Sequence, residues 1–339
     1  MKLSIKLIVP TLLLQLFLSG CNWEKEISLS GETMGTTYHI KLVAGYFNKG
    51  SAIKEKIENR LDEINQSMST YLPNSEISRF NALQDTQQQL AVSDDFLAVM
   101  QLAKRIHEIS EGAWDGTIQP LVKLWGFGST QAVQKVPAQS QITEAVARIG
   151  FQTIHVSHKG YLQKKRPSVS LDLASIAKGY GVDAISALLK DLGLKNFLVE
   201  IGGEVMAAGY RKDGRRWRVG INQPSVNAGL TDVYKVVPLH NKAMATSGDY
   251  RSYFEVEGQR FSHILDPRTG YPVNNDIVSV SVIADNCAMA DGMATAIMVM
   301  GRDRGMTLLN SLRDVEGLII MRLSDNTLVH FASNGFDAH

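Results

Sequence analysis

From Ser168 onwards the chain is a series of short β-type segments, and this series restricts the folds that it can adopt. The segments are FLVEI (197–201), EVMAAG (204–209), RWRVGI (216–221), VYKVVPL (233–239), KAMATS (242–247), RSYFEV (251–256), QRFSHIL (259–265) and DIVSVSVIA (276–284). Turn residues such as Gly202-Gly203 and Asp213-Gly214 separate neighbouring segments. Strands that are this short and closely spaced are typical of antiparallel meanders.

Helices are predicted before, between and after these strands. In the segment 51–66, Ile53, Ile57, Leu61 and Ile64 recur at spacings of four, four and three, which forms one apolar stripe on a helix. The remaining predicted elements are helices over 94–111, 141–149, 175–193, 286–300 and 302–312, a strand over 168–173, two strands around a turn at 31–35, and a final hairpin over 317–323 and 327–333. Together, these helices and strands predict an α+β protein with mainly antiparallel sheets and packed helices, forming a single domain over residues 28–335.

The first twenty residues predict export. Lys2 and Lys6 precede a short apolar run, and the sequence Leu-Ser-Gly-Cys ends at Cys21. The run is too short to span a bilayer comfortably, which is typical of a signal peptide over 1–20. The ending resembles the lipobox of bacterial lipoproteins, so we expect Cys21 to be lipidated and 21–27 to form a tether. The alternative is an ordinary secretory signal followed by a chance cysteine.

Charge and cysteine content narrow the function classes. The formal net charge is +1 with no long run of one sign, and aromatic residues make up only 7% of the chain, so no nucleic-acid partner is predicted. If Cys21 carries lipid, Cys287 has no partner within the chain. We therefore expect its thiol to be buried.

The segment 171–179 is the first candidate site. Asp172 lies near the end of a predicted strand, a helix begins near Ser175, and Lys178 lies in the first turn of that helix. Free backbone N–H groups and a cation at a helix start favour an anionic ligand. The alternative is that Ser175 is only an N-cap and Lys178 is solvated.

A second candidate is the pair Asp291 and Thr295, which are i, i+4 neighbours on one helix face. A carboxylate and a hydroxyl together suit Mg²⁺, which prefers oxygen ligands. The alternative is a tightly packed helix whose aspartate bonds a neighbouring turn.

Two further candidates involve a histidine and several aromatic residues. His263 is predicted to lie in a strand just before the turn 265–270, where it could act as a general base or simply bond to structure. Trp114 and Asp115 lie in a glycine-rich segment after a helix, and Tyr71 lies at a loop start. These aromatic residues could hold a ring system or anchor the core.

The order of these blocks along the chain is more informative than any one of them. The blocks are MGTTY from Met34, STYLPNSEISRFN from Ser69, GAWD from Gly112, LDLASIAKG from Leu171, EIGGE from Glu200, TSGDY from Thr246, HILDPRTG from His263 and ADGMAT from Ala290. This series resembles the ApbE family of FAD:protein FMN transferases, over about residues 31–301.

The resemblance implies a T-fold-like domain with an FAD site and a Mg²⁺ site. The residues implied to line the FAD are Met34, Tyr71, Ala113, Trp114, Asp115, Asp172 and Lys178, with His263 and Ile264 near the pyrophosphate. Asp291, Thr295 and the main-chain oxygen of Ser175 would hold the metal, and His263 is the candidate base. Trp114 departs from the phenylalanine of many members but keeps a flat apolar surface.

The resemblance also implies the reaction and its setting. A threonine or serine hydroxyl of an acceptor protein would attack the FMN-side phosphorus of FAD and release AMP. The implied acceptors are subunits of membrane redox complexes of the NADH:quinone oxidoreductase or Rnf type. With a lipid anchor, we expect the enzyme in the bacterial cell envelope, facing the periplasm from the inner membrane. Two alternatives remain: an FAD pyrophosphatase giving FMN and AMP, and a flavin-binding lipoprotein without catalysis.

Overall fold

The structure is a computed structural model that describes residues 24–338 apart from 128–134, 226–228, 230–231, 250–252 and 257. The predicted signal peptide, Cys21 and the start of the tether lie outside the described residues. No helix within the described part of the chain has the length and hydropathy needed to cross a membrane.

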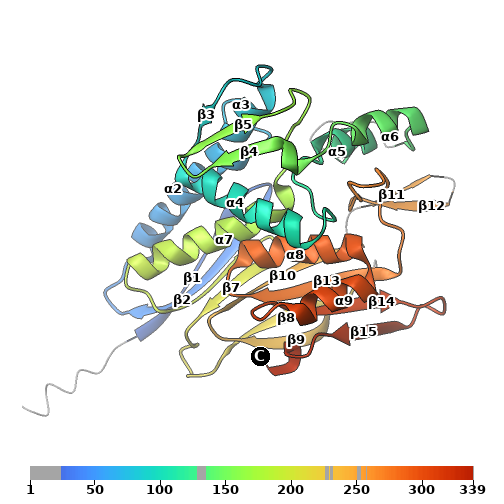
Figure 1. Ribbon diagram of the computed structural model, residues 1–339. Coiled ribbons are helices and arrows are strands. Elements are labelled where there is room, and N and C mark those ends of the chain that lie inside the picture. Colours follow the sequence, from blue (N-terminus) through green and yellow to red (C-terminus); the bar gives the residue numbers. More distant parts are fainter. Residues whose placement is uncertain are drawn as a thin grey trace, which may run out of the picture.

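The centre of the fold is one antiparallel sheet of eight strands in the order β1-β2-β6-β7-β10-β13-β14-β15 (Figure 1). Its strands are β1 (Glu24–Thr33), β2 (Thr36–Gly45), β6 (Asn196–Ile201), β7 (Glu204–Ala208), β10 (Lys242–Gly248), β13 (Ile277–Ala284), β14 (Glu316–Arg322) and β15 (Leu328–Ala332). Three smaller sheets contain β3 (Leu90–Ala91), β5 (Tyr161–Lys164) and β4 (Ile154–Ser157); β8 (Trp217–Asn222) and β9 (Val233–Leu239); and β11 (Tyr253–Val256) and β12 (Gln259–Ser262).

Strand register gives the large sheet two distinct ends. At one end of the sheet, Glu24 pairs with Gly45, Val43 with Asn196, Phe197 with Ala208 and Ala207 with Lys242. We call this end the Glu24 end. The opposite end, which we call the Gly202 end, contains the β1–β2 turn, the Gly202-Gly203 turn between β6 and β7, and the end of β10.

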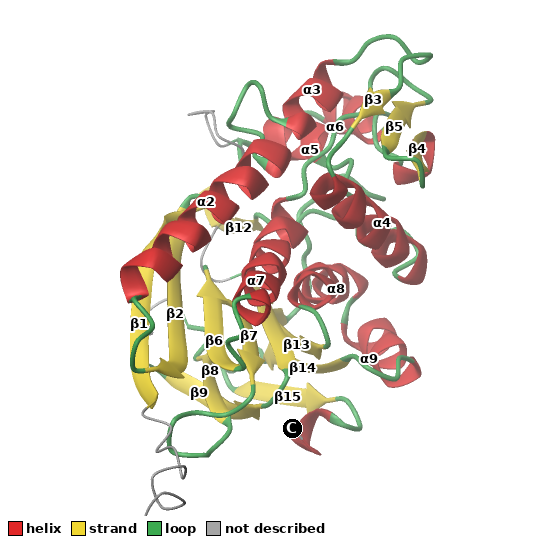
Figure 2. Ribbon diagram, turned by 90° about the vertical axis from the view of Figure 1, so that its left-hand side faces the viewer, coloured by secondary structure: helices red, strands yellow, loops and turns green. Residues whose placement is uncertain are grey.

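Helices cover one face of this sheet, as Figure 2 shows. The helices that pack on it are α2 (Gly50–Met68), α7 (Ala174–Asp191), α8 (Cys287–Met300) and α9 (Arg302–Ser311). Outside this layer, α4 (Asp94–Ile109) packs on α7 and α8, α3 (Glu76–Ala82) packs on α2, and α5 (Gln119–Trp125) packs with α6 (Gln139–Val146). The apolar stripe predicted from Ile53 to Ile64 is buried: its first three residues join the cluster formed by the sheet and α7, and Ile64 joins the neighbouring core cluster with Phe80. The β8–β9 hairpin packs on the other face, where Trp217 and Leu239 contact the sheet residues Met244 and Leu318.

The predicted α+β class with antiparallel sheets is confirmed, and each predicted helix is present to within a few residues. Cys287 is buried, as expected. Three predictions about local structure are wrong, at residues 24–27, at residues 168–173 and at His263. Glu24–Ile27, expected to end the tether, pair with β2 as the first residues of β1. Residues 168–173 form no strand, because the Asn81 side chain replaces a neighbouring strand by accepting from Leu171 N at 2.6 Å and donating to Leu171 O at 2.9 Å.

Candidate active site

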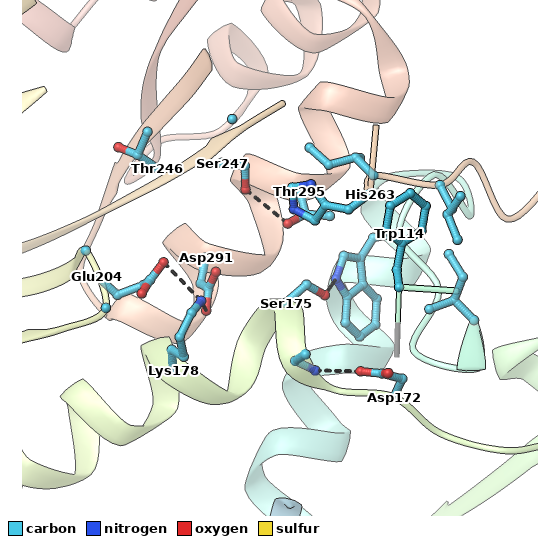
Figure 3. A pocket seen from close by; sticks show the side chains of 18 of the residues that line it. Trp114, Asp172, Ser175, Lys178, Glu204, Thr246, Ser247, His263, Asp291 and Thr295 are labelled. Carbon is cyan, nitrogen blue, oxygen red and sulfur yellow. Dashed lines mark hydrogen bonds and ion pairs between the residues drawn. The ribbon is translucent and has the colours of Figure 1, made fainter. Parts of the chain in front are cut away.

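A cavity of about 540 Å³ opens where α7 and α8 meet the Gly202 end of the sheet (Figure 3). Eleven of the twelve residues that the sequence assigned to flavin or metal binding line it. They are Tyr71, Ala113, Trp114, Asp115, Asp172, Ser175, Lys178, His263, Ile264, Asp291 and Thr295. The fold therefore brings together blocks that are more than two hundred residues apart in the chain.

Met34 is the exception, because it does not line this cavity. It lies in the β1–β2 turn with a positive φ of 50°. Its side chain lies against α7, where Met34 Cε would be 2.9 Å from a Cβ added to Gly181. Sequence spacing does not reveal this orientation, which depends on how the turn meets α7.

The start of α7 forms one wall of the cavity. Asp172 is fixed before the helix: its N–H donates to Gly116 O at 2.8 Å, and its Oδ1 accepts from Ala174 N at 3.0 Å. Desolvation raises the pKa of the Asp172 carboxyl, partly offset by the Ala174 N–H and the charge of Lys123. Ser175 follows in the first turn, and its Oγ accepts from Trp114 Nε1 at 2.9 Å. Ser175 is therefore not the N-cap that the simpler interpretation required, since that position belongs to Leu173.

Trp114 and Asp115 are held rigidly beside this wall. Trp114 is only 3% exposed, and its ring packs at a tilt on Phe151 with centroids 6.2 Å apart. Asp115 Oδ1 accepts from the N–H and hydroxyl of Thr117 at 2.8 and 2.6 Å, while its Oδ2 accepts from Phe151 N at 3.1 Å. These bonds indicate that Asp115 shapes the loop that carries Trp114, in addition to facing the cavity.

A partly buried cation in the cavity lies between two buried carboxylates. Lys178 Nζ is 3.1 Å from Glu204 Oε1 and 3.9 Å from Asp291 Oδ2 (Figure 3). Burial alone would lower the pKa of Lys178, but the two carboxylates outweigh burial and raise it. Desolvation raises the pKa of both Glu204 and Asp291, and Lys178 opposes that rise. The two carboxylates thus favour the ammonium form of Lys178.

Glu204 was not predicted as a site residue, although the EIGGE block contains it. It is 4% exposed, and its Oε2 has no hydrogen-bond partner among the described residues. The turn that positions it requires glycine, since Gly202 and Gly203 have φ of 62° and 108°, and a Cβ on Gly202 would meet Thr36 Cγ2 at 2.9 Å. An acid directly after a double glycine was the available sequence signal.

The predicted metal ligands lie on two facing helices. Asp291 Oδ2 accepts from Gly179 N at 3.0 Å, while Oδ1 accepts no hydrogen bond from the described residues. Thr295 Oγ1 lies one turn later on α8, 3.1 Å from Ser247 Oγ of β10. Among the described residues no three His, Cys, Asp or Glu side chains cluster as for a protein-only metal cage. A single carboxylate, a hydroxyl and the Ser175 carbonyl fit Mg²⁺, which usually keeps waters and takes further oxygens from substrate phosphates.

His263 lies at the cavity mouth, but the prediction that it lies in a strand is wrong. β12 ends at Ser262, and His263 follows in a bend, exposed to solvent. Its ring meets Phe127 edge to face with centroids 6.4 Å apart. Ile264 is buried beside it, and its N–H donates to Ser262 Oγ at 3.2 Å.

Other cavity residues were not assigned by sequence reasoning. They are Thr70, Ile118, Val122, Phe127, Ala174, Gly202, Gly203, Glu204, Gly220, Asn222, Met244, Thr246, Ser247, Gly248 and Leu265. Thr246 and Ser247 belong to the TSGDY block, so the sequence showed their motif but did not indicate a role for them. The apolar residues Ile118, Val122, Phe127 and Met244 belong to no motif and join the cavity only through the tertiary fold.

Comparison with known proteins gives consistent matches over nearly the whole chain. The model of the ApbE family matches residues 34–319. The FAD:protein FMN transferase of Haemophilus influenzae is 40% identical over 331 residues, covering 95% of this chain and 94% of that protein. The solved flavin transferase ApbE from Vibrio cholerae superposes with a TM-score of 0.85 at 39% identity, covering 93% of this chain and 99% of that one. The apo form of Pseudomonas stutzeri flavinyl transferase ApbE gives a TM-score of 0.84 at 34% identity, covering 93% and 96%.

Proposed function

This chain belongs to the ApbE family, and from that premise we propose that its cavity binds FAD and transfers FMN to a threonine or serine hydroxyl of an acceptor protein, with Mg²⁺ and release of AMP. Curated relatives that are 40% and 41% identical over most of the chain are FAD:protein FMN transferases. The chain is accordingly an FAD:protein FMN transferase. The metal, the leaving group and the residue roles below are our proposal.

The observation that carries the proposal is the meeting of α7 and α8 at the cavity. One helix brings Ser175 and Lys178, the other brings Asp291 and Thr295, and Gly179 N–H ties them by donating to Asp291. The Lys178 ammonium and the positive end of the α7 helix dipole favour a pyrophosphate on the α7 side. The oxygen donors of α8 and the Ser175 carbonyl would hold Mg²⁺, which when bound neutralises charge on the pyrophosphate. The Trp114 wall offers the flat apolar surface that a ring system needs.

The reaction exchanges one phosphorus–oxygen bond for another. The acceptor hydroxyl oxygen forms a bond to the FMN-side phosphorus as the bond from that phosphorus to the bridging oxygen breaks, and AMP departs with that oxygen. His263, at the mouth where an acceptor would enter, takes the hydroxyl proton. The protein's contribution is mainly positioning and charge balance, as in other phosphoryl transfers.

The setting is proposed from the sequence. A lipidated Cys21 would tether the enzyme to the periplasmic face of the bacterial inner membrane. Acceptors there would be subunits of membrane redox complexes of the NADH:quinone oxidoreductase or Rnf type. An anchored enzyme meets such partners within the plane of one membrane.

The test is mass spectrometry of an acceptor protein incubated with the enzyme, FAD and Mg²⁺. We expect one covalent FMN per acceptor, and no modification after a chelator removes the metal. Asp291→Asn keeps the shape of the side chain but removes its charge, and should lower transfer by about 100-fold or more. Asp183→Asn is the control, because Asp183 is a partly buried aspartate between α7 and α8 that accepts from Cys287 N and Ala288 N outside the cavity.

Three outcomes would contradict parts of the proposal. Full transfer by Asp291→Asn with the chelator still inhibiting would remove the metal assignment. FMN and AMP accumulating beside an unmodified acceptor would favour the pyrophosphatase. Bound, intact FAD with neither product would leave only a flavin-binding protein.

A further inference from the structure

The Glu24 end of the large sheet, opposite the cavity, exposes aromatic side chains that the core does not use. The loop 46–49 joins β2 to α2, and in it Phe47 is 94% exposed and Tyr46 is 58% exposed. The Lys25 ammonium lies 5.4 Å from the centroid of the Tyr46 ring. A fully exposed phenylalanine has an unfavourable free energy of hydration and contributes nothing to core packing, so the surface around it is a candidate contact surface.

A basic loop lies at the same end. Residues 209–216 join β7 to β8 and contain Arg211, Lys212, Arg215 and Arg216, with Asp213 as their one acid. Asp213 is paired with Arg211 at 3.3 Å, which leaves three of the four cations in excess. Tyr210, 44% exposed, opens this loop and stacks on His240 of the neighbouring turn with centroids 4.3 Å apart.

Strand pairing places both loops at the same end of the sheet as the start of the described chain. Gly45, which precedes the aromatic loop, pairs with Glu24 of β1. Ala208, which precedes the basic loop, pairs with Phe197 of β6 and lies in β7, three strands from β1 in the sheet. In Figure 2 these strand ends form the lower edge of the sheet. The acids at this edge include Glu24 and Asp285, and Asp285 is neutralised by Lys242 at 2.6 Å.

The predicted lipidation site is very close to this edge. Only Asn22 and Trp23 separate Cys21 from Glu24. Three residue steps span at most about 10 Å, even when fully extended. Acyl chains on Cys21 would therefore hold the Glu24 end within about 10 Å of a bilayer surface.

We propose that the Glu24 end is a docking surface for an anionic phospholipid bilayer, formed by Phe47, Tyr46, Tyr210 and the basic loop 209–216. The proposal rests on the predicted lipidation of Cys21, and it adds an orientation to the proposed function. Aromatic side chains favour the headgroup region of a bilayer, and lysine and arginine side chains are attracted to anionic lipids. Acyl chains alone tether a protein without orienting it, whereas a second contact of this kind fixes which end faces the membrane.

The orientation has a consequence for the acceptor. β2 runs from the Gly202 end to the Glu24 end over ten residues, which corresponds to about 30 Å. Docking through the Glu24 end therefore holds the cavity about 30 Å from the bilayer, facing away from it. The hydroxyl that receives FMN must then be presented by an extramembrane segment of the acceptor, not by a residue at the lipid surface.

The test uses full-length protein purified from membranes and reconstituted into vesicles that contain phosphatidylglycerol. An environment-sensitive fluorophore is attached in one variant at Phe47→Cys and in another at Ser324→Cys, an exposed residue in the β14–β15 turn at the Gly202 end. Cys287 is fully buried and should not react. On vesicles relative to detergent, we expect iodide quenching to fall several-fold at position 47 and to stay unchanged at position 324.

Charge variants test the basic loop. The pair Arg215→Glu and Arg216→Glu should restore quenching at position 47 on the same vesicles. The pair Lys104→Glu and Arg105→Glu makes the same charge change on the exposed face of α4 and should leave the protection intact. Equal quenching of both labels on vesicles, or protein that fails to float with vesicles, would overturn the proposal. Transfer to a soluble acceptor in detergent is measured in parallel, so that loss of docking and loss of catalysis are distinguishable.

Discussion

Lys164 lies in an environment that is unusual for a lysine. Its side chain is 1% exposed, and its ammonium donates to the carbonyls of Asn81 and Leu83 at 3.1 Å and of Pro167 at 3.4 Å. These carbonyls end α3 and begin the segment that leads to Asp172, so one cation joins β5 to both. Desolvation lowers the pKa of Lys164 from 10.5 to about 8.

This shift predicts a pH dependence of stability. Between about pH 8 and pH 10.5 the unfolded chain holds a proton on Lys164 that the folded chain has released, so stability rises with pH in this window. Relative to Lys164→Met, which removes the titrating group, wild type should gain about 2 kcal/mol between pH 7.5 and pH 10. Urea unfolding of both proteins at the two pH values measures the difference. Parallel pH responses would show that the lysine does not titrate in this range.

At the scale of elements, the approach of α7 to α8 sets the geometry of the site. A Cβ added to Gly179 would lie 2.5 Å from the Cys287 carbonyl oxygen and 2.7 Å from Ala288 Cα. Both contacts are with backbone, which cannot move without displacing α8. The same residue donates its N–H to Asp291, so one glycine governs both the helix spacing and the orientation of the proposed metal ligand.

Gly179→Ala should therefore lower the free energy of unfolding by about 2 kcal/mol or more, despite the better helix propensity of alanine. Gly292→Ala on α8 is a matched control, because its Cβ would meet only the tip of the Ile106 side chain, which can rotate away. Chemical denaturation of the two variants compares the costs. An equal or smaller loss in Gly179→Ala would mean that the helices separate easily.

Segment 168–173 has the apolar alternation of a β-strand but does not form one. Its alternation of apolar residues is that of a strand, and Val169, Leu171 and Leu173 are indeed buried. The partner that satisfies its backbone is a side chain, Asn81, from a helix ninety residues earlier. Sequence periodicity indicates which side chains are buried, but it does not identify what pairs with the backbone.

At the scale of the whole molecule, the cavity wall draws on residues from Thr70 to Thr295. FAD bound there would connect segments that meet only in the folded state, and would stabilise that state by mass action. With a chelator present to prevent turnover, FAD at 100 times its dissociation constant should add about 2.7 kcal/mol, a shift of a few degrees in Tm. Tyr71→Ala should need more FAD for the same shift while its ligand-free Tm changes little, since Tyr71 is 70% exposed. An unchanged Tm at saturating FAD would contradict binding in this cavity.

The sequence by itself determined the class of the fold and nearly all of the predicted site. Antiparallel strands and helices followed from local apolar spacing and turn residues, because those signals act over a few neighbouring residues. All twelve flavin and metal residues were taken from the ordered motifs, and eleven of them line one cavity.

Only the tertiary structure decided how those motifs act on one another. The position of Lys178 between Glu204 and Asp291, the turning of Met34 onto α7, and the burial of Lys164 each depend on segments brought together from distant parts of the chain. The same holds for the Glu24 end, where loops from separate strands present aromatic and basic side chains on one edge. Side-chain orientation, desolvation and charge pairing arise from these long-range contacts, which local sequence patterns do not encode.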